Sequence, residues 1–501
     1  MKAIKGKPFF AGIHVPDKKA LACRQTTEIM PPPDYVYISL SQSLGKPAVC
    51  VVEKGQKVKE GELIAKADGA ISSNVFASLA GEVIDIKQLV GANGGTETYI
   101  VIEGNGSDEK AYLPRLIKPS AEQIKERIKE CGIVGLGGAG FPAAVKVSPR
   151  TPVDTLVLNG AECEPYLTCD HRLMLERDEE IVRGARYIAQ ALGVSKIIIG
   201  IEANKPDCIA KFEKYDDIQP VILKKQYPMG SEKHLIYVTT GRKVGIGKLP
   251  ADSGVVVQNV ATAFAVCDAV DLGKPLIDRI VTVSGESIAQ PKNLWVRVGT
   301  PVKEIIKYCG GEKTPPKKVI QGGPMTGLAL ATYDVYTHKT TSGLLLLNEK
   351  EAAAEEPTPC LNCGMCADVC PMHLMPMQTA FYSAAGDFEN AAKLGNTLAC
   401  IECGACEYTC PAKRPLIQAI RKTKAYIRSK VNPQPLVKPV DQKGKSAPIV
   451  PPTEDAKISK PVQEVLDKIA DGKRGSLENT AVKENTVEEK PEQTDGNKEE
   501  K

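Results

Sequence analysis

The chain has 501 residues, of which 42% are hydrophobic and 25% are charged, and 65 basic against 61 acidic side chains leave a net charge of +4. At about 150 residues per domain, this length predicts about three folded units. So small a net charge excludes a protein that coats nucleic acid, and no apolar run reaches the roughly 18 residues of a transmembrane helix. The first residues lack the apolar core of a secretory signal, so we expect a soluble intracellular protein.

Residues 1–112 are predicted to form an N-terminal segment followed by a small β-barrel. Short strands and glycine turns alternate between Val51 and Ile86, in a spacing that resembles biotinyl/lipoyl-like domains. Carriers of that type present a modifiable lysine at a hairpin tip. The corresponding tip here, Ile71–Asn74, contains no lysine. We therefore expect a barrel that serves as structure.

Strands and helices alternate in residues 113–275, which predicts a Rossmann-like α/β domain. The glycine-rich loop Gly135–Gly140 precedes Pro142, where a helix is expected to begin. The N–H groups of such a loop and the positive end of the helix can hold a phosphate, which Lys146 could neutralise. The loop lacks the G-x-G-x-x-G fingerprint of dinucleotide sites. A single phosphate, as on FMN, suits it at least as well, and tight packing is the alternative.

Three further segments of this domain carry polar groups that could contact a cofactor. Asn159–Pro165 directly follows a predicted strand, where the ligand sites of α/β folds collect. Tyr227–Glu232 is a small-residue loop that ends in a carboxylate, and Val257–Thr262 places two amides beside a hydroxyl. Each segment alone could be loop capping. Residues 276–350 then return to short strands around one helix and predict a small α+β module.

Half of the sixteen cysteines lie between Cys360 and Cys410. They form two C-x2-C-x2-C-x3-C-P runs, the pattern of two-cluster iron–sulfur proteins in which the fourth cysteine of each run binds the other cluster. We assign one [4Fe–4S] cluster to Cys360, Cys363, Cys366 and Cys410. We assign the second to Cys400, Cys403, Cys406 and Cys370. Two zinc sites are the rival, but zinc needs neither the third C-x2-C step nor the closing proline.

Residues 351–430 are therefore predicted to form a helical ferredoxin-type domain. Met377–Ala385 and Phe388–Leu394 have helical patterns interrupted by Gly386, and a basic helix is predicted over Leu416–Ile427. The basic face is either solvated or a docking surface for an acidic ferredoxin-like partner. Residues 431–501 are rich in Pro, Lys and Glu, so we expect a disordered tail.

Paired clusters and a phosphate loop in one chain predict an electron-transfer function. A nicotinamide delivers two electrons together as hydride, whereas an iron–sulfur cluster accepts one at a time, and a flavin can do both. The sequence thus predicts a converter between two-electron and one-electron transfer, with a flavin–nicotinamide site beside the clusters.

Several of these segments resemble the NADH-oxidising flavoprotein subunit of respiratory complex I. GLGGAGFPAAVK (Gly135–Lys146) and NGAECEP (Asn159–Pro165) match its glycine loop and acidic motif, and Gly230–Glu232 and Gln258–Thr262 are similar to its G-E-E and N-N-V-E-T segments. With FAGIHVPDKK near the start and the two cysteine runs, residues 10–430 resemble the RnfC family, the C subunits of the Rnf electron-transport complexes.

This resemblance implies an ion-translocating ferredoxin:NAD oxidoreductase with FMN, two [4Fe–4S] clusters and NAD(H) as substrate. Hydride would pass between nicotinamide and flavin, single electrons would pass through the clusters, and the complex would move Na⁺ or H⁺ across the membrane. The implied partners are integral-membrane subunits and a ferredoxin-like iron–sulfur subunit, with this chain peripheral on the cytoplasmic face. Residues 276–350 would be a β-grasp (SLBB-like) module.

The resemblance also implies a set of cofactor contacts, carried over position by position. The FMN phosphate and ribityl end would be held by Gly137, Gly138 and Lys146, and the flavin more broadly by Asn159, Glu162, Gln258, Asn259 and Thr262. The NADH side would be lined by Phe141, Glu164, Gly230, Ser231 and Glu232. Leu136, Ala161 and Ser231 depart from the complex I pattern, and Cys163 could tune the flavin through a weak S–H contact.

Two other functions stay open at this point. The cobalamin reductase of propanediol-utilising microcompartments shares the flavin fold and the cluster pairs. A non-catalytic electron relay would use the glycine loop only for packing.

Overall fold

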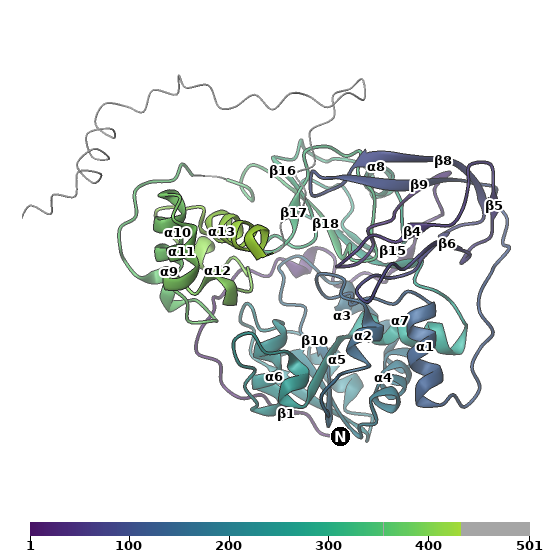
Figure 1. Cartoon of the computed structure of the whole chain (residues 1–501), viewed down its shortest axis with the longest axis horizontal. Coiled ribbons are helices and arrows are strands. Elements are labelled where there is room, and N and C mark those ends of the chain that lie inside the picture. Colours follow the sequence, from purple (N-terminus) through teal and green to yellow (C-terminus); the bar gives the residue numbers. More distant parts are fainter. Residues whose placement is uncertain (354, 432–501) are drawn as a thin grey trace, which may run out of the picture. The chain divides into compact units, whose positions relative to one another are not determined.

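The structure is a computed structural model, and it describes residues 1–353 and 355–431. This part of the chain contains four β-sheets and a helical, cysteine-rich region (Figure 1). The tail expected at 431–501 lies outside the described residues, apart from Val431 at the end of a helix.

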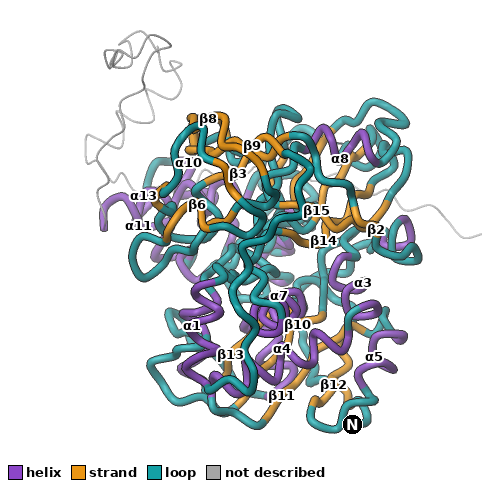
Figure 2. Tube along the Cα trace, turned by 90° about the vertical axis from the view of Figure 1, so that its right-hand side faces the viewer, coloured by secondary structure: helices purple, strands orange, loops and turns teal. Residues whose placement is uncertain are grey.

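A five-stranded parallel sheet forms the centre of the α/β region, at the bottom of Figure 2. Its strands, in spatial order, are β1 (Ile4–Lys5), β12 (Ile218–Leu223), β11 (Lys196–Glu202), β10 (Thr155–Gly160) and β13 (Val255–Asn259). The central strands are runs of buried Val, Ile and Leu, as parallel strands covered on both faces require.

Helices cover both faces of this sheet. One apolar core joins β10 and β11 to α1, α4 and α7, and a second core joins the opposite face to α6. The helices of the region are α1 (Ala121–Glu130), α2 (Ala143–Lys146), α3 (Cys169–Glu176), α4 (Asp178–Leu192), α5 (Pro206–Phe212), α6 (Glu232–Thr240) and α7 (Val260–Asp271), with the 3-10 turn η2 (Pro250–Ser253).

Local sequence explains the longest of these helices. Helix α4 begins with three acidic residues, which stabilise its positive end, and it stops at Gly193, whose φ of +70° suits glycine. Gly184 lets α4 approach α7 closely, because a Cβ there would lie 1.8 Å from the carbonyl oxygen of Ala263. The α4–α7 contact fixes α7, and with it the polar residues at the end of β13.

Two small antiparallel sheets enclose the core of the β-barrel. One contains β3 (Tyr35–Ser39), β9 (Thr96–Gly104), β8 (Gly81–Val90) and β5 (Lys57–Val58), and the other contains β4 (Val49–Cys50), β6 (Leu63–Lys66) and β7 (Val75–Phe76). The hairpin tip is packed into the molecule: Asn74 Nδ2 donates to the Glu130 carbonyl at 3.1 Å, and Lys339 Nζ donates to the Asn74 carbonyl at 2.6 Å. These bonds fit a structural role for the barrel.

A six-stranded mixed sheet with one helix forms the small α+β module. It contains β17 (Leu328–Ala329), β16 (Lys318–Gln321), β18 (Gly343–Leu347), β14 (Asp278–Ser284), β15 (Lys292–Arg297) and β2 (Glu28–Ile29), with α8 (Val302–Tyr308) packed beside it. The N-terminal segment is thus shared between regions. Its β1 extends the parallel sheet and its β2 extends the module, with η1 (Lys19–Leu21) between them.

The cysteine-rich region is helical. It contains α9 (Met365–Asp368), α10 (Pro376–Ala384), α11 (Phe388–Leu394), η3 (Thr397–Ala399), α12 (Ala405–Tyr408) and α13 (Leu416–Val431). The predicted break between the two middle helices is confirmed, because Gly386 separates α10 from α11 with a φ of +76°. The basic helix predicted over Leu416–Ile427 runs on to Val431.

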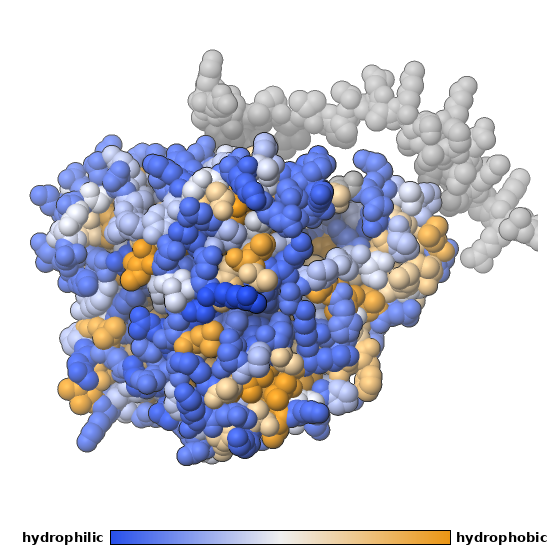
Figure 3. All heavy atoms as spheres, turned by 180° about the vertical axis from the view of Figure 1, so that it is seen from behind, coloured by the Kyte–Doolittle hydropathy of each residue, from blue (hydrophilic) through white to orange (hydrophobic). Residues whose placement is uncertain are grey.

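No helix among the described residues is long and apolar enough to cross a membrane. The face shown in Figure 3 is mostly hydrophilic, with separate apolar patches.

Candidate functional site

The glycine loop is held by hydrogen bonds at its ends and is exposed at its tip. Gly135 donates its N–H to the Phe141 carbonyl at 2.8 Å, and Leu136 donates to Thr262 Oγ1 at 3.0 Å. Between these ties, Gly137, Gly138 and Ala139 are exposed, and a Cβ on Gly138 would meet nothing within 4 Å. A ligand can therefore reach the backbone at the tip of the loop.

The helix expected after the loop is much shorter than the pattern suggested. Pro142 caps α2, which is a single turn that ends at Lys146. One turn sums few peptide dipoles, so a phosphate here would depend on loop N–H groups and the lysine rather than on a helix dipole.

Lys146 and Glu232, predicted on opposite sides of the cofactor, contact each other directly. Lys146 Nζ donates to Glu232 Oε1 at 2.6 Å and to the Val257 carbonyl at 3.1 Å. The two side chains are 28% and 37% exposed, so a ligand can reach the pair. An anion at the loop would share the lysine with Glu232.

Two of the predicted flavin contacts meet at the ends of neighbouring strands. Asn159 lies opposite Asn259 in the β10–β13 pairing. Asn259 Oδ1 accepts from the Ala261 N–H at 2.7 Å and so caps α7, while Asn159 Nδ2 donates to the Gly230 carbonyl at 2.8 Å. A Cβ on Gly137 would lie 2.9 Å from Asn259 Nδ2, so the loop needs glycine at that point. The two amide side chains thus connect the strand ends to Gly230 and to the start of α7.

Gln258 differs from its neighbours because its amide is unused. The side chain is 2% exposed, and neither amide atom has a hydrogen-bond partner within the described part of the chain. A buried amide without partners costs about 1–3 kcal/mol per group, so native proteins normally satisfy it. The amide donor and acceptor of Gln258 suit the edge of a flavin ring. The exposed loop glycines leave room for a phosphate. The residues of this site therefore fit FMN.

Glu162 is buried and held by residues that the sequence pattern did not indicate. Its Oε1 accepts from the Asp170 N–H at 2.7 Å, and its Oε2 lies 3.6 Å from Lys19 Nζ. Burial, with the nearby charge of Glu162, raises the pKa of Asp170 to about 6. Lys19 comes from the N-terminal segment, far away in sequence, so only the fold brings it here.

Glu164 contacts the α+β module. Its Oε2 accepts from the Met325 N–H at 3.0 Å and its Oε1 from the Thr326 hydroxyl at 2.5 Å. Burial raises the pKa of this carboxyl. Both oxygens are thus engaged by a loop of the module, and the structure does not bring Glu164 to the Lys146–Glu232 pair.

Gly230, Ser231 and Phe141 are the remaining residues predicted on the nucleotide side. A Cβ on Gly230 would lie 3.1 Å from Cys163 Sγ, which shows how closely the two segments pack. The Ser231 hydroxyl lies 2.9 Å from His234 Nδ1. Phe141 is partly buried at the end of the glycine loop. Burial raises the pKa of Cys163 to about 12, so it stays a thiol.

The structure brings Cys370, the fourth cysteine of the first run, together with the first three cysteines of the second run. One cavity has Cys370, Cys400, Cys403 and Cys406 among its lining residues. A charge on Cys370 contributes to the raised pKa of Cys400 and of Cys403, after the larger effect of burial. Four thiols around one cavity are the donor set of a [4Fe–4S] cluster, so these residues fit it.

The other four cysteines lie nearer the surface. Cys360 and Cys363 are exposed and Cys366 is buried. Cys366 packs in an apolar cluster that includes Cys410, and charges on Cys410 and Cys360 contribute to its raised pKa, after burial. The fourth cysteine of the second run, Cys410, therefore lies near Cys366 of the first run, as does Cys360.

The cysteine-rich region directly contacts helix α6 and the loop Tyr227–Glu232, the predicted nucleotide loop. Tyr227 donates its hydroxyl to the Cys403 carbonyl at 2.7 Å, and His234 Nε2 lies 2.8 Å from the Pro371 carbonyl. Cys163 and Cys403 pack in the same apolar cluster. The four cysteines around the cavity are thus the set that faces the α/β region.

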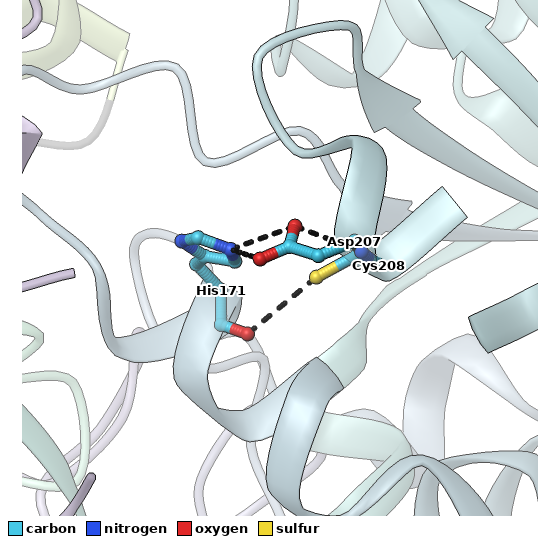
Figure 4. A group of neighbouring side chains, drawn as sticks. All are labelled: His171, Asp207 and Cys208. Carbon is cyan, nitrogen blue, oxygen red and sulfur yellow. Dashed lines mark hydrogen bonds and ion pairs between the residues drawn. The ribbon is translucent and has the colours of Figure 1, made fainter. Parts of the chain in front are cut away.

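A separate group of possible metal ligands, His171, Asp207 and Cys208, lies between α3 and α5 (Figure 4). His171 Nε2 is 3.0 Å from an Asp207 oxygen, and the Cys208 thiol donates to the His171 carbonyl at 3.6 Å. Burial raises the pKa of Cys208, which keeps it a thiol. The three side chains form hydrogen bonds within this group, so we interpret them as a structural link between α3 and α5.

The parallel sheet with its open glycine loop, the unused buried amide and the eight paired cysteines define an iron–sulfur flavoprotein. Family models match each part: the RnfC barrel sandwich hybrid domain (7–107), the Nuo51 FMN-binding domain (128–268), the SLBB domain (280–329) and the 4Fe-4S dicluster domain (359–414). These matches confirm the predicted barrel, flavin, SLBB and cluster classes, and with them FMN and paired [4Fe–4S] clusters as cofactors.

Whole-chain relatives give the family. The chain is 45% identical to the C subunit of the proton-translocating ferredoxin:NAD(+) oxidoreductase complex of Clostridium ljungdahlii, over 84% of this chain and 94% of that one. It is 40% identical to the Na(+)-translocating counterpart of Acetobacterium woodii, over 85% and 98%, and 44% identical to the C subunit of the ion-translocating oxidoreductase complex of Rhodobacter capsulatus, over 77% and 76%. The chain belongs to the RnfC family, the C subunits of the Rnf complexes.

Proposed function

We propose that this chain is the NAD(H)-reacting subunit of an ion-translocating ferredoxin:NAD oxidoreductase complex. The observation that carries the proposal is the direct contact between the nucleotide loop and one set of four cysteines, through Tyr227 and the Cys403 carbonyl at 2.7 Å. FMN, when bound, can take up hydride from NADH and release its electrons singly to iron–sulfur clusters. The contact supports a flavin site and a cluster that lie close to each other.

The chain's own residues would do the holding and orienting. The backbone of Gly137 and Gly138 and the ammonium of Lys146 would bind the FMN phosphate, and the unused Gln258 amide would contact the ring. Asn159, Asn259 and Thr262 would keep the loop and the strand ends in register through the bonds described above.

The positions of the cysteines give an order for the clusters. Cys370, Cys400, Cys403 and Cys406 would hold the cluster next to the α/β region, and Cys360, Cys363, Cys366 and Cys410 the cluster near the surface. Electrons would be exchanged with a partner at the exposed set. The exposed basic residues of α13, such as Lys422 and Arg428, suit an acidic iron–sulfur partner.

The relatives also support a place in a membrane complex, since their names describe subunits of ion-translocating complexes. Because no helix among the described residues can span a membrane, this chain would associate peripherally, on the cytoplasmic side where NADH is found. Co-expression with the integral-membrane subunits should move the protein into the membrane fraction. Expression without them should leave it outside that fraction.

The test of the redox proposal is anaerobic reconstitution of the full chain. We expect about eight irons per chain, FMN bound in equal amount, and bleaching of the flavin absorbance by NADH, followed by electron paramagnetic resonance (EPR) signals of reduced clusters. A flavin that stays oxidised in excess NADH would contradict the proposal and favour a non-catalytic relay. The cobalamin reductase is not favoured, because the three relatives described above all belong to ion-translocating or ferredoxin:NAD(+) complexes.

A further inference from the structure

His234 lies between the nucleotide loop and the ligand segment of the nearer cluster. Its side chain, on α6, is 8% exposed. Nε2 lies 2.8 Å from the Pro371 carbonyl, and Nδ1 lies 2.9 Å from the Ser231 hydroxyl. A carbonyl can only accept, so Nε2 must carry the hydrogen, and Nδ1 of the neutral ring must accept from Ser231.

The imidazole is also fixed from the side. The ring of Phe9 packs against it with 4.8 Å between the ring centroids. The ring therefore has one tautomer, two partners and little freedom to turn. One partner belongs to the predicted nucleotide loop, and the other directly follows the cluster ligand Cys370.

The nucleotide loop is tied to the cysteine-rich region at both ends. Tyr227, at its start, donates to the Cys403 carbonyl, and His234, just beyond its end, donates to the Pro371 carbonyl. Both acceptors are backbone groups at or beside ligands of the same predicted cluster. Two hydrogen bonds thus connect this loop and the start of α6 to two ligand segments of one predicted cluster.

We propose that His234 is a positioning residue that transmits nucleotide occupancy at Ser231 to the cluster held by Cys370, Cys400, Cys403 and Cys406. The inference rests on the proposed function, because it takes Gly230–Glu232 as part of the nucleotide site. Groups that hydrogen-bond beside metal ligands orient those ligands and tune the metal, so a change in the Ser231–His234 bond alters the cluster's surroundings. Binding at the loop then changes the cluster's spectrum without any electron transfer.

The test uses the anaerobically reconstituted full chain with ADP-ribose, which has the nucleotide part of NADH but cannot exchange hydride. EPR of the dithionite-reduced protein is recorded with and without ADP-ribose, and ADP-ribose affinity is measured by calorimetry on the same sample. In the parent protein we expect ADP-ribose to shift the signal of the cluster assigned to Cys370. In H234A we expect this shift to be lost, with iron content, ADP-ribose affinity and flavin bleaching by NADH within twofold of the parent.

Two variants frame this result. Gln can present an amide donor to Pro371 and an oxygen to Ser231, so H234Q should restore the shift. His14 is exposed, so H14A should behave as the parent. If H234A fails to retain iron, S231A breaks the same relay from its other end, and it too should lose the shift.

The outcomes distinguish failure of the His234 role from failure of the nucleotide site. A shift that persists in H234A or S231A overturns the role of His234, as does a parent that binds ADP-ribose without any shift. A parent that does not bind ADP-ribose overturns the proposed nucleotide site, and this inference with it.

Discussion

At the scale of single residues, the proposed flavin site includes a lysine that already forms an ion pair within the chain. Lys146 lies between Glu232 and the Val257 carbonyl, at 2.6 and 3.1 Å. Both partners are acceptors, so the ammonium is held in place, and the Glu232 carboxylate balances its charge. An FMN phosphate at the open glycine loop would share this ammonium with Glu232.

Replacing Lys146 with Met should therefore remove flavin binding. We expect K146M to retain less than about a tenth of the parent's FMN after reconstitution, since the loss of one charge-assisted hydrogen bond costs about 1.5–3 kcal/mol. Flavin absorbance per chain is the measurement. K129M, which changes an exposed lysine on α1, serves as the control. Full FMN content in K146M would show that the loop does not hold the phosphate through this lysine.

Asp170 gives a second residue-scale prediction, on stability against pH. Burial, then the charge of Glu162, raises its pKa from 3.8 to about 6 in the folded chain. The folded protein thus holds this proton more tightly than the unfolded one, so stability from this group is present at acid pH and is lost as pH rises from about 4 to about 6.

In D170N this loss should disappear. Asparagine keeps an oxygen for the 2.7 Å bond from Asn259 Nδ2. The unfolding free energy of D170N relative to the parent should therefore rise by about 1 kcal/mol between pH 5 and pH 7. Urea unfolding of the cofactor-free protein measures it, with D108N, at an exposed carboxylate, as control. An unchanged difference across this range would contradict a raised pKa at Asp170.

At the scale of elements, the two cysteine runs fold as copies of one unit. Each run turns at a glycine with φ of +79°, Gly364 or Gly404, into the one-turn helices α9 and α12. The fourth cysteine follows each helix, at positions 370 and 410. Because the cysteine after each helix lies near cysteines of the other run, each proposed cluster would take ligands from both runs.

Serine substitutions should expose this crossing. C370S should remove the same cluster signal as C403S, leaving about four irons, and the double variant should lose no more. C410S should instead remove the signal that C366S removes. EPR and iron analysis provide the measurement, and C23S, outside both runs, is the control. If C370S instead matched C366S, each run would hold its own cluster.

At the scale of the whole described molecule, a ladder of alternating charges joins three regions. Glu60 of the barrel lies 2.8 Å from Arg297 of the module, which lies 3.4 Å from Asp278. Lys274 then lies 2.9 Å from Asp278 and 3.3 Å from Asp268 at the end of α7. Arg297, Asp278 and Lys274 are largely buried. Each of these charges therefore needs an opposite charge nearby to offset its loss of hydration.

Arg297 is the member whose loss should matter most. R297M leaves Glu60 and Asp278 without that cation, and we expect it to lower the free energy of unfolding by about 3 kcal/mol. R186M breaks the exposed pair with Asp217 and should cost less than about 1 kcal/mol. Chemical unfolding compares the two, and faster hydrogen exchange around Glu60 in R297M should locate the effect. Equal costs in both variants would refute the ladder's role.

The amino-acid sequence alone determined the features that depend on local chemistry. Cysteine spacing predicted the clusters and their crossing, and Gly386 predicted the break between α10 and α11. The alternation of strands and helices predicted the α/β domain, because each strand of such a sheet is followed by a helix that covers it. Motif resemblance added the barrel, the flavin domain and the family, all of which the comparisons confirm.

Only the tertiary structure decided which distant groups meet. Lys146 pairs with Glu232, Lys19 with Glu162, and Glu164 with the module's loop, across sequence separations that no local pattern records. His234 acquires its role from Pro371 in the same way. The physical reason is that the role of a charged group or an imidazole depends on the groups that it contacts. The packing of whole sheets and helices, rather than the neighbouring sequence, determines those contacts.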